Sequence, residues 1–252
     1  MTNYSLEQQI LIPDWPAPVS VKAAVTTRVG GSSQSPYSGF NLATHVGDRA
    51  DTVQQNRNHL MTLLELPTEP VWLNQVHSDV VVNAAGFAND RDADASYTST
   101  VDTVCAVMTA DCLPALLCNR AGTVVAAAHA GWRGLAAGIL EKTVAAMASD
   151  PAEVLVWLGP AIGPSAFEVG AEVREAFVAQ HGVAEQAFTA RGNDKWLADI
   201  YMLARIHLQA AGVTGFFGGD YCTYTDSQRF FSYRRDHTTG RMVSLIWLDS
   251  QN

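Results

Sequence analysis

The chain has 252 residues, of which 48% are hydrophobic and 16% are charged, and its formal net charge at pH 7 is -9. These proportions are typical of a globular protein with a sizeable core, and they exclude a disordered chain. The acidic balance argues against nonspecific binding to nucleic acid or to an anionic membrane, because both require a basic surface.

The length allows one large domain or two small ones, since domains usually hold roughly 100 to 200 residues. No linker, repeat or low-complexity tract divides the chain, so we predict a single domain over residues 1–252. No apolar stretch approaches the length of about 18 residues that crosses a bilayer. The N-terminal MTNYSLEQQILIPDW also lacks the features of an export signal, so we expect a cytoplasmic protein with reduced cysteines.

The first half of the chain contains several apolar runs. Residues 19–27 and 71–83 are rich in β-branched residues, which predicts two strands. Between them, Asp51 and Gln54 resemble a capping pair that opens a helix. Residues 101–108, 113–118 and 123–129 are short apolar runs typical of strands, and the turn NRAG precedes the last of them.

In the second half, residues 135–147 have apolar positions at helical spacing, and VLVWLG (154–159) predicts a strand before the irregular loop PAIGP. Further helices are predicted at 171–180 and 196–212. The segment 230–248 contains TTG between two β-prone runs, which predicts a hairpin. The irregular alternation of helices and strands, without a nucleotide-binding fingerprint, indicates a mixed α/β or α+β fold.

Polar side chains interrupt the apolar run LNQVHSDVV around His77. Buried polar groups need partners, so these residues indicate either a functional site or a tight turn that carries a surface histidine.

Two further reactive side chains end apolar runs. Cys112 follows Asp111 where a predicted strand breaks open, although a buried, inert thiol is the common alternative. His129 closes a predicted strand before AGWRG, a strand-to-helix corner of the kind that often binds ligands, although a packed core histidine is the alternative.

Together, His77, Cys112 and His129 supply the ligand types that Zn²⁺ prefers, and three protein ligands leave a fourth position for water. Bound zinc lowers the pKa of such a water to about 7. The intervals of 35 and 17 residues match no zinc-finger spacing, so the spacing alone does not establish the site.

Several motifs occur in a fixed order along the chain: TTRVGGSS, FNLATHVGD, NQVHSDVV, MTADCLPALL, AAAHAGWRG, LGPAIGPSAFEVG, CTYTDSQRFFSYRRD and TGRMVSLIWL. They resemble the bacterial laccase-domain family, also called multicopper polyphenol oxidase-like, whose members are also known as purine nucleoside phosphorylases and peptidoglycan editing factors. The resemblance covers about residues 20–248. It implies a layered α-β-β-α domain with mixed sheets, in which His77, Cys112 and His129 bind zinc, with copper as the alternative.

For activity, the resemblance implies phosphorolysis of adenosine, inosine, guanosine and methylthioadenosine to a free base and a pentose 1-phosphate, with deamination of adenosine. The partners are therefore small molecules, and the chain is expected to be a monomer or homodimer. Deamination also needs an acid/base carboxylate, for which Asp111 is the candidate, with a loop-holding role as the alternative.

Phosphorolysis needs a cradle for phosphate built from arginine and backbone N–H groups. The candidates are Arg28, which is followed by Gly30, Gly31 and Ser32, then Arg133, and the pair Arg234 and Arg235. Asn41 is a candidate for contacts with sugar or base, and His45 for lining the pocket. Structural roles for the arginines and a turn amide for Asn41 are the alternatives.

Three rival functions remain open. A blue-copper oxidase would use Met108 as an axial ligand, but a laccase of the usual kind needs many His-x-His pairs that the sequence lacks. A cysteine hydrolase acting on muramyl-peptide cell-wall precursors would use Cys112 as nucleophile and His129 as base. A binding module without catalysis is the third.

Overall fold

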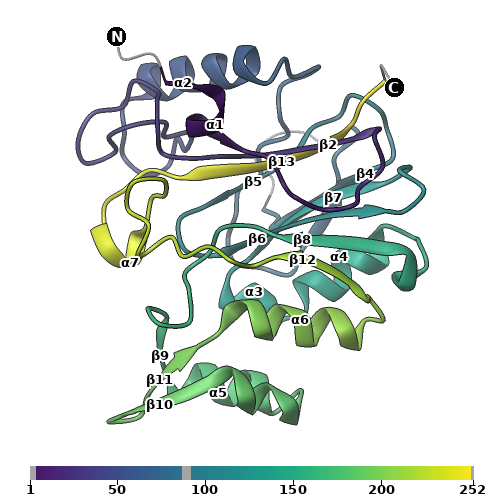
Figure 1. The fold of residues 1–252 in the computed structure, drawn as a ribbon, viewed down its shortest axis with the longest axis vertical. Helices are drawn as coiled ribbons and strands as arrows, with labels where there is room; N and C mark the ends of the chain where they lie inside the picture. The colour runs from purple at the N-terminus through teal and green to yellow at the C-terminus, as the bar shows by residue number, and fades with distance from the viewer. Residues whose placement is uncertain (1–3, 87–91, 251–252) are drawn as a thin grey trace.

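Two β-sheets packed face to face form the centre of the computed structural model, which describes residues 4–86 and 92–250 (Figure 1). The four-stranded sheet is antiparallel and has the order β1 (Ile10–Leu11), β2 (Val21–Thr26), β13 (Met242–Leu248), β5 (Cys105–Thr109). The six-stranded sheet is mixed and has the order β12 (Gly215–Gly218), β8 (Val154–Leu158), β6 (Leu113–Asn119), β7 (Val125–Ala130), β4 (Ala95–Thr98), β3 (Val81–Asn83).

Strand β6 shows why the central strands are apolar along their whole length. Leu113 and Leu117 pack in the core between the six-stranded sheet and the helices, whereas Leu116 and Cys118 pack in the core between the two sheets. Successive side chains of a strand point to opposite faces, so a strand buried on both faces has no polar face.

Helices cover the outer face of each sheet (Figure 1). On the four-stranded sheet lie α1 (Leu6–Gln9) and α2 (Ala50–Leu63), and on the six-stranded sheet lie α3 (Trp132–Ala136), α4 (Ile139–Ala146) and α6 (Ile200–Ala210). This arrangement confirms the mixed α/β fold and the α-β-β-α layering.

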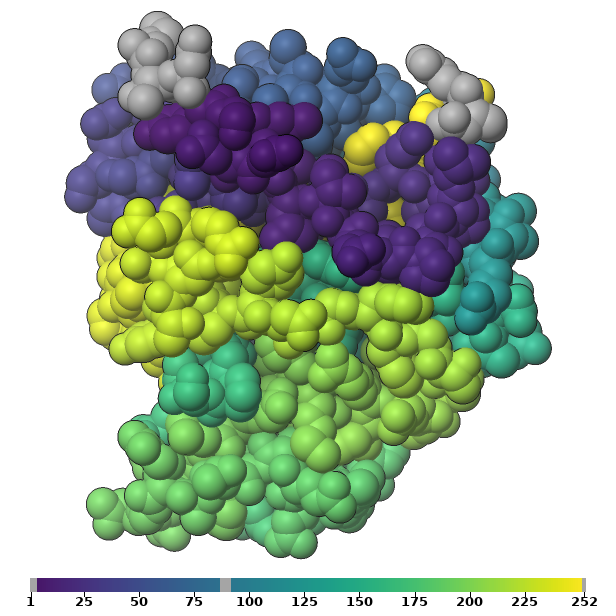
Figure 2. Space-filling view, viewed as in Figure 1, coloured from purple at the N-terminus to yellow at the C-terminus, as the bar shows by residue number. Residues whose placement is uncertain are grey.

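A smaller antiparallel sheet forms the lower end of the molecule, drawn in green in Figures 1 and 2. Its order is β10 (Phe188–Gly192), β11 (Lys195–Ala198), β9 (Glu168–Gly170), and it is accompanied by α5 (Ala171–Val178) and the 3-10 helix η2 (Gly182–Ala187). A short 3-10 helix η1 (Pro151–Glu153) precedes β8.

The predicted strand at residues 71–83 is wrong for most of its length. Only Val81–Asn83 forms a strand, and two isolated bridges precede it. The backbone N–H groups of residues 76–78 donate to the carboxylate of Asp94, so they are not available to a ladder.

Three predicted helices differ in detail. Asp51 lies in the first turn of α2 and pairs with Arg49 instead of capping the helix. The helix predicted at 135–147 is divided into α3 and α4 at Gly138, whose φ is 90°. The helix predicted at 196–212 begins at Ile200, because residues 195–198 pair as β11 and Asp199 accepts a hydrogen bond from the first turn.

The C-terminal hairpin prediction is wrong. Residues Tyr233–Asp236 form the short helix α7, and its N-cap Ser232 accepts a hydrogen bond from the N–H of Arg235 at 3.2 Å. Strand β13 pairs with β2 and β5, which come from distant parts of the chain. Within the described residues, no helix combines the length and apolarity needed to cross a membrane.

Candidate metal centre

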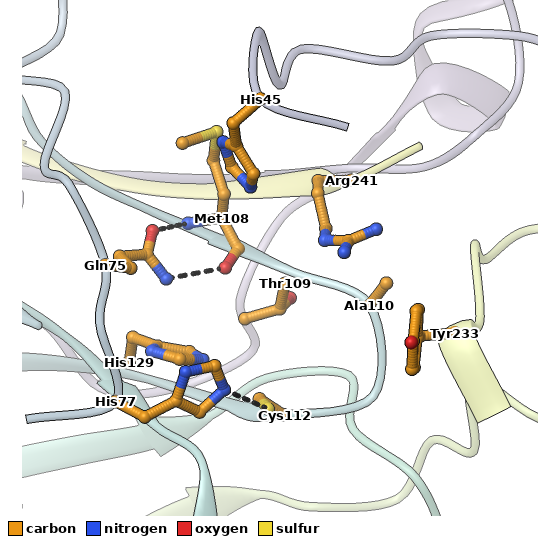
Figure 3. A pocket seen from close by; sticks show the side chains of 10 residues that line it. All are labelled: His45, Gln75, His77, Met108, Thr109, Ala110, Cys112, His129, Tyr233 and Arg241. Carbon is orange, nitrogen blue, oxygen red and sulfur yellow. Dashed lines mark hydrogen bonds between the residues drawn. The ribbon is translucent and has the colours of Figure 1, made fainter. Parts of the chain in front are cut away.

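His77, Cys112 and His129 converge in the lining of one pocket (Figure 3). One ligand atom from each residue lies within 4.8 Å of the others. The Sγ of Cys112 lies 3.8 Å from the Nε2 of His77, and the rings of His77 and His129 have centroids 4.9 Å apart at an interplanar angle of 77°. The structure therefore brings the three predicted side chains together.

Each of the three comes from a different part of the fold. His77 lies in the irregular segment before β3, with a left-handed φ of 61°. Cys112 lies in the break between β5 and β6, directly after Asp111, whose φ is 95°. His129 is the fifth residue of β7, on the face that carries Val125 and Ala127 between the two sheets.

Asp94 fixes the positions of His129 and of the loop that carries His77. Its side chain is fully buried, and Oδ1 lies 2.7 Å from the Nδ1 of His129. The same carboxylate accepts hydrogen bonds from the N–H groups of Val76, His77 and Ser78 and from the Ser78 hydroxyl. In the neutral form of the His129 ring, the proton is on Nδ1, which faces the carboxylate, and the lone pair is on Nε2, the nitrogen that a metal would bind.

The protonation equilibria reflect these contacts. Burial alone would raise the pKa of the Cys112 thiol, but the charge of His129 and hydrogen bonds from both histidines lower it from 9.0 to about 6. Burial alone would lower the pKa of His129, but Cys112 and Asp94 raise it from 6.5 to about 9. Burial opposes ionisation of Asp94 as well, yet hydrogen bonds from His129 and Ser78 hold its pKa at about 2. At neutral pH, Cys112 is therefore a thiolate, the form that binds metal.

The donor set fits a metal ion of the zinc type. In a tetrahedral site with Zn–S bonds of about 2.3 Å and Zn–N bonds of about 2.0 Å, sulfur and nitrogen lie about 3.5 Å apart, close to the separation between Cys112 and His77. Gly131 leaves room beside the donors, since a Cβ there would stand 2.9 Å from the Cδ2 of His77 and 3.1 Å from the Sγ of Cys112.

The three donors face a cavity of about 360 Å³. Its remaining lining consists of His45, Gln75, Met108, Thr109, Ala110, Tyr233 and Arg241 (Figure 3). Gln75 is tied to β5 by hydrogen bonds in both directions with the backbone of Met108, at 2.7 and 2.8 Å. The pKa of His45 is lowered by burial and by the charges of Arg241 and Arg57, so its imidazole is neutral at pH 7.

Cys112 and Tyr233 also line a second, adjoining cavity of about 250 Å³ that contains the predicted Asp111, Arg133 and Arg234. Both carboxylate oxygens of Asp111 accept hydrogen bonds at 2.6 Å, from the hydroxyl of Thr223 and from the backbone N–H of Arg234. Asp111 thus fastens α7 to the loop that carries Cys112.

The remaining predicted arginines and Asn41 lie elsewhere. The guanidinium of Arg28 donates to two backbone carbonyls and lies over the ring of Phe231, and Arg28 lines neither cavity. Asn41 is fully buried, where its amide binds Asp48 and accepts the backbone N–H of Arg241 at 3.0 Å. Arg235 donates to the backbone carbonyls of residues 223, 224 and 230.

Sequence reasoning missed Asp94, Gly131 and Arg241. Arg241 lies directly before β13 in the motif TGRMVSLIWL. Because this segment was predicted to form a hairpin, the sequence did not indicate that Arg241 lines the cavity. Asp94 occurs in a polar, turn-like stretch, DRDADAS, that gives no sign of burial.

Comparison with known proteins gives close relatives. A protein of Escherichia coli (strain K12) named purine nucleoside phosphorylase YfiH is 59% identical over 242 residues, which cover 95% of this chain and 99% of the relative. Purine nucleoside phosphorylase PA4543 of Pseudomonas aeruginosa is 56% identical over 239 residues, which cover 94% and 98%.

Among solved structures, Neisseria meningitidis protein NMB0706 is similar with a TM-score of 0.93 and 54% identity, covering 96% of this chain and 100% of that one. YlmD from Geobacillus stearothermophilus is similar with a TM-score of 0.84 and 28% identity, covering 93% and 94%. The family described as multi-copper polyphenol oxidoreductase laccase matches residues 22–249. The chain therefore belongs to this laccase-domain family.

Proposed function

We propose that this protein is a zinc-dependent purine nucleoside phosphorylase that also deaminates adenosine. Adenosine, inosine, guanosine and methylthioadenosine are the proposed substrates of phosphorolysis. The observation that carries the proposal is the convergence of His77, Cys112 and His129 on a cavity that also holds Arg241, which forms no ion pair with any carboxylate of the described residues. The names of the relatives, purine nucleoside phosphorylase, support the same reaction class.

Zinc is the proposed metal because the donor set offers one thiolate and two imidazoles with an open face. When bound, zinc supplies Lewis acidity and a lowered pKa for water. A blue-copper centre would add a weak axial methionine, but the thioether of Met108 points toward His45 and away from Cys112 (Figure 3). Strong blue absorbance of the copper-loaded protein would favour the oxidase instead.

Arg241 is the proposed phosphate-binding residue of the larger cavity. Its Nη1 donates to the backbone carbonyls of Thr239 and Gly240, which fixes the position of the guanidinium. Among the ion pairs of the described residues, none includes Arg241. Burial lowers the pKa of this guanidinium, yet arginine stays charged at pH 7, so an anion in the cavity would compensate it.

In phosphorolysis, an oxygen of the bound phosphate forms a bond to C1′ of the pentose while the bond between C1′ and the purine nitrogen breaks. The base leaves with the electron pair and takes up a proton. Arg241 orients the phosphate, and the neutral His45 offers a ring N–H to the substrate. Tyr233, which is 55% exposed and lines both cavities, offers an aromatic face for the purine.

Deamination of adenosine is the second reaction proposed for this site. Water adds to the purine carbon that carries the amine, and ammonia leaves. Asp111 is the candidate carboxylate because it lines the adjoining cavity next to Cys112. Its oxygens already accept two hydrogen bonds, so we assign it the positioning of Cys112 and α7 as well.

A nucleoside screen with and without phosphate, combined with elemental analysis of the purified protein, tests the proposal. We expect zinc in the protein, free base only when phosphate is present, and inosine from adenosine without phosphate. Arg241→Gln should raise the KM for phosphate at least about ten-fold, equivalent to about 1.4 kcal/mol. Arg28→Gln is the matched control and should leave this KM unchanged. Release of base without phosphate would contradict phosphorolysis.

A cysteine hydrolase acting on a muramyl-peptide cell-wall precursor is the second candidate. The thiolate of Cys112, the imidazolium of His129 that has taken up its proton and the carboxylate of Asp94 follow the order of nucleophile, acid/base and orienting group. Activity that survives stringent zinc removal and is abolished by thiol alkylation would favour this hydrolase over the zinc enzyme.

A further inference from the structure

Glu141, His181 and His207 form a second cluster of metal-binding side chains, away from both cavities. Glu141 lies in the first turn of α4 and His207 in the last turn of α6, and His181 lies between α5 and η2. The cluster therefore joins the helices that cover the six-stranded sheet to the smaller lobe at the lower end of the molecule, which consists of β9, β10, β11, α5 and η2 (Figure 1).

The geometry of this cluster resembles that of the first. One ligand atom of each residue lies within 4.8 Å of the other two, as for His77, Cys112 and His129. The rings of His181 and His207 have centroids 4.9 Å apart at 86°, and those of His77 and His129 also lie 4.9 Å apart, at 77°. In both clusters, a histidine Nδ1 faces a carboxylate oxygen, here at 2.5 Å between His207 and Glu141.

Two polar atoms of the cluster lack a partner. The side chain of His207 is fully buried, and its Nε2 forms no hydrogen bond with any described residue. The Oε2 of Glu141 is also buried without a hydrogen-bond partner in the described part of the chain. A buried polar atom without a partner costs about 1 to 3 kcal/mol, so each of these two atoms indicates an unfilled bonding position in the cluster.

The chemistry of the three side chains selects a cation. A neutral imidazole carries a lone pair on one ring nitrogen, a carboxylate oxygen carries only lone pairs, and an ion bound by Nδ1 of His207 and by Glu141 would take the place of their hydrogen bond. Phe177 closes one side, its ring 5.6 Å from that of His207, while Glu141 and His181 are partly exposed and leave an entry path.

We propose that Glu141, His181 and His207 form a second metal site, which binds a divalent ion of the zinc class through one carboxylate oxygen and one nitrogen of each ring. Two histidines and one glutamate are a ligand set that zinc uses in proteins, and a water completes the tetrahedron. The ion ties α4 and α6 to the segment between α5 and η2, so its role is to hold the lobe of β9, β10 and β11 against the core.

Metal stoichiometry and optical spectra of the full-length protein test this site. The protein is stripped with a chelator and reloaded with Zn²⁺, or with Co²⁺ as a spectroscopic probe. We expect two ions for each wild-type chain and one ion for His181→Gln. Cys112→Ser should lose the sulfur-to-cobalt charge-transfer band of the first site and keep the d–d absorption of a nitrogen and oxygen site, which Cys112→Ser combined with His181→Gln should lose.

Thermal unfolding gives an independent readout. With zinc, His181→Gln should unfold at a lower temperature than the wild type, and with chelator the two proteins should unfold together. His207→Gln should behave in the same way if it folds, and His59→Gln, which changes an exposed histidine on α2, is the control that should bind two ions. Loss of all cobalt absorption in Cys112→Ser, or unchanged stoichiometry in His181→Gln, would overturn the second site.

Discussion

Gly131 lies so close to Cys112 that a Cβ at position 131 would stand 3.1 Å from the Sγ. The same Cβ would stand 2.9 Å from the Cδ2 of His77, so it would intrude on two of the three proposed ligands. A glycine between a strand and a helix usually indicates a backbone conformation that other residues avoid. At Gly131, however, φ is -61°, a value that other residues adopt readily. The glycine is thus needed for the space beside the donors.

Gly131→Ala should therefore weaken zinc binding about 10-fold or more, because the ligands must shift to admit the methyl group. A zinc titration against a competing chelator measures the change. Gly182→Ala is the matched control, since a Cβ there meets nothing within 4 Å. Equal zinc affinity in the two variants would show that the donors adjust at little cost.

Asp94→Asn should lower the affinity for zinc by about 10- to 100-fold, because an amide cannot replace the charge behind His129. The variant should also lose stability, since Asp94 accepts hydrogen bonds from three backbone N–H groups in one loop. Metal content and urea unfolding measure the two effects. Asp92→Asn, an exposed neighbour that contacts Asn74, should change neither, and a similar zinc affinity in both variants would contradict this role.

The four thiols should differ in reactivity at pH 8 after zinc removal. Cys112 and Cys222 should be alkylated, because hydrogen bonds and, for Cys112, the charge of His129 lower their pKa values despite burial. Cys105 and Cys118 should not react in the folded protein, because burial raises their pKa values to about 12. Mass spectrometry of the alkylated protein identifies the modified positions, and labelling of Cys105 or Cys118 before unfolding would contradict the expectation.

The raised pKa values of Cys105 and Cys118 also predict how stability depends on pH. Each thiol ionises near 9 when unfolded and near 12 when folded, so its contribution is fully present below about pH 9. The contribution is lost as the pH rises from about 9 through about 12. The free energy of unfolding of Cys118→Ala should therefore fall less steeply over this range than that of the wild type, and parallel curves would exclude Cys118 as a cause.

Leu117→Ala should destabilise the fold without altering metal binding. Leu117 is fully buried on the helix-facing side of β6, and the resulting cavity should cost about 2 to 5 kcal/mol in urea unfolding. Val101→Ala removes a side chain that is 53% exposed and should change stability by less than about 0.5 kcal/mol. A loss of zinc from Leu117→Ala would mean that core packing and the metal centre are coupled.

The strands that position Cys112 and His129 were predictable because a buried strand needs a continuous apolar run with turn residues at its ends. Three reactive side chains near such ends suggested a metal site, but their proximity in space depends on pairing between strands that are distant in sequence. Residues 230–236 show the limit most clearly. Their β-prone sequence predicted a strand, whereas the contacts of Asp111 with Arg234 and Thr223 hold them in a loop and a short helix.

Asp94 could not be identified from local pattern, because its partners lie 16 to 35 residues away in sequence. The position of Arg241 likewise follows from β13 pairing with β5, which carries Met108 and Thr109 to the cavity. Residues whose role is set by tertiary contacts of this kind leave little trace in periodicity or composition.

Asp94 accepts hydrogen bonds from three consecutive backbone N–H groups of the loop of His77 and from the Ser78 hydroxyl, so protein contacts hold the shape of this loop. A rigid metal site of this kind selects a metal ion by its size and its preferred ligands, because the site does not rearrange around the ion. The stripped protein should consequently crystallise in the same form as the loaded one, and one divalent ion should replace another without rearranging the chain.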